Sequence, residues 1–267
     1  RVASLVPDIA ATDPYQRLLN EWVVWGTRLQ HGPAPTPSLS PYQLPFSDMG
    51  KREFLRVLER HIDFDAIPDL ATPDCPRLVV GTVDVNAGEF ETFTEDDMSA
   101  KAILASAAVP SLFEAVEIDG HYHWDGLFSQ NPPVYDLMHT DPERKPDELW
   151  VVQINPQTRD DEPKSVDEIS DRRNELSGNI SLNQELRFIE TVNEWVDEGD
   201  LSNENYSHTE VRRIVVDEKL GYASKLDRSS EFIERLRDEG IADAERFLAE
   251  TDFDGHQHDG FTDPSHD

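Results

Sequence analysis

The sequence predicts an α/β protein, and two kinds of pattern favour that class. Residues 78–85 form a mostly apolar run, Leu-Val-Val-Gly-Thr-Val-Asp-Val, which is typical of a strand inside a sheet covered on both faces. Apolar residues at helical spacing occur on both sides of this run, for example over 13–30 and 180–198. A chain of 267 residues is long enough for one such domain with a helical appendage.

The first predicted element is a helix over 13–30, which Asp13 can cap and in which Pro14 suits the first turn. We expect its Trp-rich apolar face to pack against the sheet. Residues 31–48 are rich in proline and predict a loop, and apolar spacing over 51–64 predicts a second helix.

After the strand at 78–85, a turn at 86–88 leads into a partner strand at Phe90–Phe93. Thr94 and Asp97 resemble a capping box in front of an Ala-rich helix over 99–108, which must end before Pro110.

A tight hairpin is predicted over 115–125. Ile118, Tyr122 and Trp124 favour strands, and Asp119-Gly120 suits a two-residue turn whose central positions both need positive φ. The second strand ends on Asp125, and Gly126 lets the backbone bend sharply away from it. A carboxylate delivered by a rigid strand into a loop can serve as a base, although an ordinary Asp-Gly turn also fits the turn chemistry.

The C-terminal half predicts a buried strand at Trp150–Ile154 and, at Val211–Val216, a further strand or a strand-like return to the sheet. Helices are predicted over 165–177 and 180–198, broken at Gly178, and over 230–239 and 241–250, split at Gly240. We expect an α/β unit over 1–220, a helical segment over 221–250 and a disordered acidic tail over 251–267.

The composition is strongly acidic, with 55 Asp and Glu against 24 Lys and Arg and a net charge of −31. Evenly spread carboxylates with little lysine favour a salt-rich cytoplasm, where screening weakens self-repulsion. This charge argues against nucleic-acid binding and disfavours electrostatic docking on anionic lipid, although transient membrane-surface contact stays open. Cys75 is the single cysteine, so the chain cannot form an internal disulfide.

A longer pattern surrounds the hairpin. The run Ala105-Ser106-Ala107-Ala108-Val109-Pro110-Ser111-Leu112-Phe113, then Asp125-Gly126, then Asn131-Pro132-Pro133, resembles the second half of a patatin-like phospholipase domain. That family shows Ala-Ser-x-x-x-Pro-x-x-Phe, Asp-Gly-Gly or Asp-Gly-Ala, and Asn-x-Pro in this order. Leu127 departs from the usual third residue of the Asp-Gly motif.

The resemblance implies a three-layer α/β/α fold, incomplete at its N-terminus, and an acyl hydrolase acting on lipid esters. It implies that Asp125 is the base of a Ser–Asp dyad. The family's nucleophile lies in Gly-x-Ser-x-Gly, which does not occur in these residues, so we expect it upstream of Arg1. The alternatives are a non-catalytic binding or regulatory module and an inactive truncated product.

His121, His123 and Asp125 alternate along one predicted strand and so share a face. They could in principle bind a metal, or the two histidines could border the dyad site; we expect neither a metal nor a cofactor. Asn131 could steady the loop through its side chain, or could simply form a turn before Pro132.

The charge density predicts that the fold gains stability as salt rises from low to molar concentration, because screening weakens repulsion between carboxylates. The melting temperature, measured across this range, should increase. A flat or falling melting temperature would contradict the proposed adaptation to salt.

Overall fold

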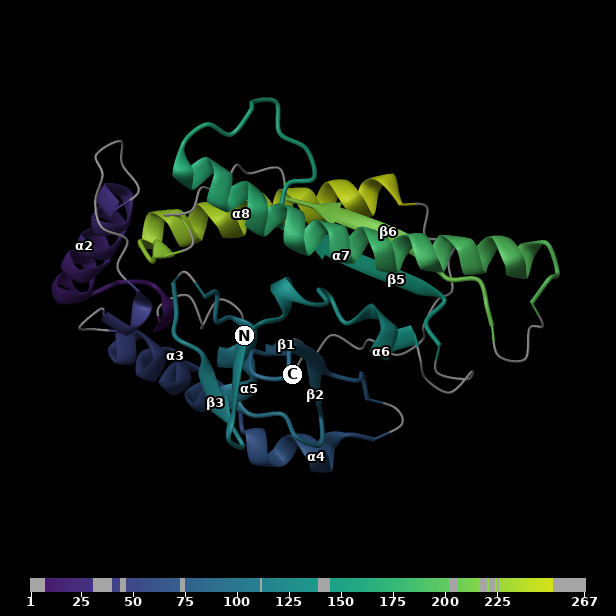
Figure 1. The fold of residues 1–267 in the computed structure, drawn as a ribbon, viewed down its shortest axis with the longest axis horizontal. Coiled ribbons are helices and arrows are strands. Elements are labelled where there is room, and N and C mark those ends of the chain that lie inside the picture. Colours follow the sequence, from purple (N-terminus) through teal and green to yellow (C-terminus); the bar gives the residue numbers. More distant parts are fainter. Residues whose placement is uncertain are drawn as a thin grey trace, which may run out of the picture.

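The computed structural model of the chain describes residues 8–30, 40–43, 47–72, 75–110, 112–138, 145–201, 206–216, 220, 224 and 226–251. They form a mixed α/β fold (Figure 1), which confirms the predicted class. The strands are β1 (Val79–Asp84), β2 (Glu89–Thr94), β3 (Val116–Ile118), β4 (His121–Asp125), β5 (Glu148–Gln153) and β6 (Glu210–Val215). The α-helices are α2 (Pro14–Gln30), α3 (Ser47–His61), α4 (Ile67–Leu70), α5 (Ala100–Ser106), α6 (Val134–Met138), α7 (Val166–Asp197) and α8 (Ser230–Glu250). The 3-10 helices are η1 (Pro41–Gln43), η2 (Phe64–Ala66) and η3 (Gly126–Phe128).

The first sheet is antiparallel and has the strand order β2-β1-β4-β3. The predicted hairpin is confirmed as β3 and β4, and its turn residues Asp119 and Gly120 have φ values of 50° and 87°. Helix α5 packs on one face of this sheet, where Phe93, Met98 and Ala102 are buried. Asp125, at the C-terminal end of β4, is therefore held by a sheet that α5 covers on one face.

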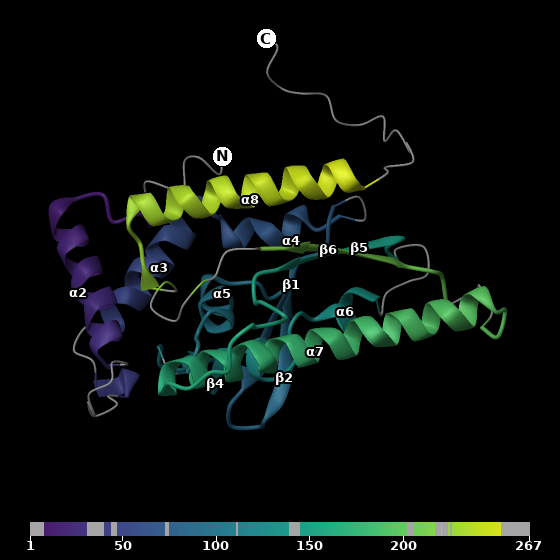
Figure 2. The ribbon, with the colours of Figure 1, turned by 90° about the horizontal axis from the view of Figure 1, so that it is seen from above.

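The second sheet pairs β5 with β6 in parallel, so the return strand joins β5 and not the first sheet. These strands lie between α7 and α8 (Figure 2). The core under α7 comprises Val134, Leu149, Val151, Leu182, Leu186 and Ile189. The prediction of a fully buried strand is wrong, because Trp150 and Val152 alternate with the buried residues and remain exposed.

Two predicted helix breaks are also wrong. Helix α7 runs unbroken through Gly178, and α8 runs unbroken through Gly240. Glycine in a helix interior costs about 1 kcal/mol relative to alanine, which packing and capping can offset. Helix α7 begins with a capping box formed by Ser165 and Glu168, and α8 is capped by Ser229.

The N-terminal helices follow the prediction in position but not in packing. Asp13 accepts hydrogen bonds from the backbone N–H groups of Tyr15 and Gln16 at the start of α2. However, Trp22 and Trp25 are exposed, so the expected packing of this face on the sheet is wrong.

The predicted capping box of the Ala-rich helix is replaced by a different cap. Ser99 accepts a hydrogen bond from the backbone N–H of Ala102 and so caps α5, while Thr94 and Asp97 close the preceding turn. Within the described part of the chain, no helix combines the length and apolarity needed to span a membrane. The expected acidic tail lies outside the described residues from 252 onward, and the domain boundaries stay predictions.

Candidate active site

Asp125 stands where β4 passes into η3, as the sequence predicts. Its backbone N–H donates to the carbonyl of Ala108, at 3.1 Å. Its Oδ1 accepts a hydrogen bond from the backbone N–H of Leu127, at 2.9 Å, and thereby caps η3. The Ala-Ser-x-x-x-Pro run and the Asp-Gly motif, which lie far apart in sequence, are therefore joined at the candidate base.

Gly126 is needed because two backbone segments come close together. A Cβ at this position would lie 2.9 Å from the carbonyl oxygen of Gly81 in β1. Backbone atoms cannot give way as a flexible side chain can, so a larger residue would push the loop off β1. The glycine thus sets the distance between the sheet and residues 125–131, which we call the Asp125 loop.

Helix α7 holds the other side of this loop, a role that the sequence did not predict. The Ser177 hydroxyl donates to the carbonyl of Leu127 at 3.2 Å, and the backbone N–H of Asn131 donates to the Ser181 hydroxyl at 3.1 Å. The two serines are four residues apart and share one helix face. Asn131 is therefore attached through its backbone in these contacts, whereas the sequence suggested its side chain.

One turn further along the same face, Glu185 accepts a hydrogen bond from the Gln130 side chain at 2.7 Å. Burial raises the pKa of Glu185, and the charge of Asp136 adds to this, while the bond from Gln130 opposes it. Helix α7 thus contacts the loop over two full turns.

Gly178 lets α7 approach closely enough for these contacts. A Cβ on Gly178 would overlap the Cδ1 atom of the buried Leu127. Leu127 is the residue that departs from the Gly or Ala expected in the Asp-Gly motif. The larger side chain is accommodated because the facing helix position carries none. In the sequence, the pattern that indicates this close packing is Ser177 and Ser181, four residues apart, with Gly178 between them.

The two histidines of β4 pair with carboxylates on β1 and β2. His121 is exposed and its Nδ1 lies 2.7 Å from Asp84 Oδ2, whereas His123 is buried and its Nε2 lies 2.6 Å from Glu91 Oε2. Among the described residues, the group whose ligand atoms lie within 4.8 Å of one another is Asp84, Glu91 and His123. The structure therefore brings Asp84 and Glu91 close to His123. The sequence had suggested a different set, made of His121, His123 and Asp125.

Asp84 is the most constrained of these acids. The backbone N–H of Ala87 lowers the pKa of the Asp84 carboxyl, burial opposes this, and the N–H of Asn86 and the His121 ring lower it further. The two amides donate to Oδ1 at 3.0 Å and 2.7 Å. Asp84 thus closes the β1–β2 turn while it holds the hairpin strand β4.

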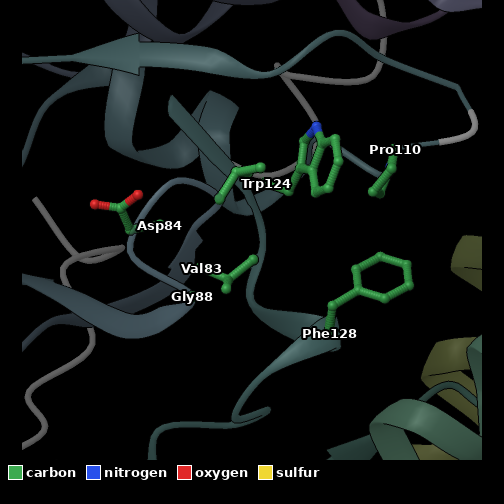
Figure 3. A pocket seen from close by; sticks show the side chains of 7 residues that line it. Val83, Asp84, Gly88, Pro110, Trp124 and Phe128 are labelled. Atoms are coloured by element: carbon green, nitrogen blue, oxygen red, sulfur yellow. The ribbon is translucent and has the colours of Figure 1, made fainter. Parts of the chain in front are cut away.

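A cavity of about 390 Å³ lies beside the Asp125 loop. Val83, Pro110, Trp124 and Phe128 gather around it, and the Asp84 carboxylate points away from their side chains (Figure 3). The cavity wall is almost wholly apolar. Because Trp124 precedes Asp125 and Phe128 closes η3, an apolar group in this cavity would lie next to the loop that carries the carboxylate.

Residues 14–138 match the family model of patatin-like phospholipases, which confirms the resemblance predicted from the sequence. No curated protein matches the chain. The matched segment includes α5, the hairpin and the Asp-Gly motif, and it ends before β5 and α7. The helix that holds the Asp125 loop thus lies beyond the matched segment.

We predict that Gly178→Ala destabilises the protein by about 1–3 kcal/mol, because its methyl group overpacks against Leu127. In a Leu127→Ala background the same change should cost much less, since the overlapping atoms are gone. Urea unfolding of the two single variants and the double variant measures this coupling. Gly240→Ala, at an open helix position, is the control and should be neutral or stabilising by up to about 1 kcal/mol. Additive effects of the two substitutions would contradict the contact.

We predict that Asp84→Asn destabilises the protein most at neutral pH. The folded-state pKa of Asp84 is lowered, so its stabilising effect is complete above the unfolded value of about 3.9 and is lost as pH falls through the folded value. The difference in unfolding free energy between the variant and the wild type should therefore shrink below about pH 4. Urea titrations from pH 7 to pH 2 measure it, and a gap that stays constant would exclude this linkage.

Proposed function

We propose that the protein hydrolyses lipid esters through a Ser–Asp dyad in which Asp125 is the base and the serine comes from outside these 267 residues. The observation that carries the proposal is the placement of Asp125, at a strand end, inside the segment that matches the patatin-like phospholipase model. The sequence contains no Gly-x-Ser-x-Gly, so the nucleophile is assigned to another part of the protein.

In the proposed reaction, the Asp125 carboxylate accepts the proton of the serine hydroxyl while the serine oxygen attacks the ester carbonyl. The proton then passes to the departing alcohol, and the acyl group stays on the serine. In the second half, Asp125 takes a proton from water, whose oxygen attacks the acyl-enzyme. The serine regains a proton and the fatty acid leaves.

The surroundings of Asp125 suit this role. The hydrogen bond from Leu127 N–H fixes the carboxylate on its loop, and the contacts to α7 fix the loop itself. A base must be held within a few tenths of an ångström of its working position to be effective. Rigid support from both β4 and α7 supplies that restraint before substrate arrives.

The apolar cavity beside the loop suits the acyl chain. Its lining by Trp124, Phe128 and Val83 would remove methylene groups from water, at about 0.8 kcal/mol for each one buried. The proposal thus places the chain in the cavity and the ester near Asp125.

We predict that Asp125→Asn in the full-length protein lowers esterase turnover by about 10²–10⁴-fold, since asparagine cannot accept the serine proton. Initial rates on a soluble ester, with circular dichroism to confirm folding, measure the effect. Asp119→Asn is the matched control, because the same substitution falls at the other end of β4 in an exposed turn that tolerates asparagine.

Asp119→Asn should keep near-normal turnover, and His121→Ala should cost far less than Asp125→Asn. Near-normal turnover of Asp125→Asn would exclude the dyad. Loss of activity in the histidine variants with rescue by added metal would favour a metal-dependent reaction instead.

A further inference from the structure

Helix α2 carries an exposed apolar stripe. Tyr15, Leu18, Trp22 and Trp25 recur at intervals of three and four residues, which places them on one side of the helix. Their exposed fractions are 64% for Tyr15, 64% for Leu18, 55% for Trp22 and 61% for Trp25. We call these four residues the α2 stripe. Side chains of this size are rarely left together in water without a binding role.

The opposite side of α2 attaches the helix to the body of the protein. The Asn20 side chain donates to Asp227 at 3.1 Å and accepts from the backbone N–H of Arg228 at 2.8 Å. Val24, one turn further on, is buried. The α2 stripe therefore faces outward at one end of the molecule, where both views place α2 (Figures 1 and 2).

The charge of this end differs from that of the rest of the chain. Residues 8–61 contain six Lys and Arg and six Asp and Glu, so they are balanced, although the whole chain carries a net charge of −31. Helix α8, in contrast, has seven acidic and three basic residues. The end that bears the α2 stripe is thus less acidic than the rest of the chain. Lipid phosphate groups would therefore repel this end less than they would repel the rest of the surface.

A groove of about 550 Å³ lies between α2 and the residues that precede α8. The groove is lined by Leu18, Trp22 and Trp25 of the α2 stripe, and also by Asn20, Glu21, Val24, Asp227 and Ser229. A groove lined by both aromatic and polar side chains matches the boundary between acyl chains and headgroups, where tryptophan and tyrosine concentrate in membrane proteins.

We infer that the α2 stripe docks the protein on a zwitterionic lipid surface, with Trp22 and Trp25 inserted at the level of the headgroups. An amphipathic helix lying in the plane of the interface buries its apolar side in this manner. The inference rests on the proposed function, because docking brings the Asp125 site to lipid esters held in a membrane. Apolar burial drives the contact, so molar salt leaves it intact and acidic lipids do not strengthen it.

The test uses the full-length protein and phosphatidylcholine vesicles with brominated acyl chains, in molar salt. Tryptophan fluorescence should be quenched on binding, and co-sedimentation should give the partition coefficient. The double variant Trp22→Ser, Trp25→Ser should bind at least about tenfold more weakly, since two large side chains no longer leave water. Trp195→Ser is the matched control, because Trp195 is 43% exposed on the acidic helix α7, and it should bind as the wild type does.

Three results would overturn the inference: no vesicle binding by the wild type, equal loss in the control, or dimers that depend on Trp22 and Trp25 when no lipid is present. The last result would assign the stripe to a second copy of the chain. Asp125→Asn should still bind vesicles, and the double variant should still hydrolyse a soluble ester. Binding without turnover would therefore refute the proposed function alone, and turnover without binding would refute the docking surface alone.

Discussion

Helix α7 can approach the Asp125 loop only because Gly178 has no side chain. One side of this helix packs on β5 through Leu182 and Leu186, and the adjacent side holds the loop through Ser177 and Ser181. The position of the loop is consequently tied to the core of the second sheet. A change in the packing of β5 would be transmitted to the candidate base through a single rigid element.

The first sheet supports the base from the other direction through polar pairs. Asp84 and Thr82 on β1 are buried opposite His123 and Asp125 on β4. Buried polar groups must find hydrogen-bond partners, and here Asp84 receives two backbone amides and a histidine. The pair of Asp84 with His121 favours one strand register over its neighbours, because a slip of β4 by one residue would separate these two side chains.

Local sequence patterns predicted the elements that depend on local physics. The Asp119-Gly120 turn, the strand ending on Asp125 and the extent of α2 follow from turn chemistry, strand propensity and helix capping. Features that depend on distant partners could not be predicted in this way. Gly178 resembles a helix break in sequence, and only the approach of Leu127, about 50 residues earlier, gives it its actual role.

The same distinction explains the error at α2. A Trp-rich helical face predicts burial on average, because large aromatic side chains gain most from leaving water. Whether such a face finds a surface to pack on depends on the whole fold. In this structure α2 is attached to the rest of the protein through Asn20 and Val24, on the side away from the two tryptophans. The surroundings of the candidate base were likewise predicted only in part: the strand that ends on Asp125 and the bend at Gly126 follow from the hairpin pattern, whereas the support by α7 does not.

The Asp125 loop and α7 lie far apart in the sequence, so they are synthesised at different times. Leu127, Gln130 and Asn131 form hydrogen bonds with residues 50 to 55 positions later in the chain. Because the ribosome releases the chain from its N-terminus, the hairpin can form while α7 has not yet been made. The Asp125 loop gains its full set of restraints only after Glu185 has emerged. The nascent protein would therefore carry a formed β4 with an unfinished site, and a chain halted near residue 138 would keep its site in that unfinished state.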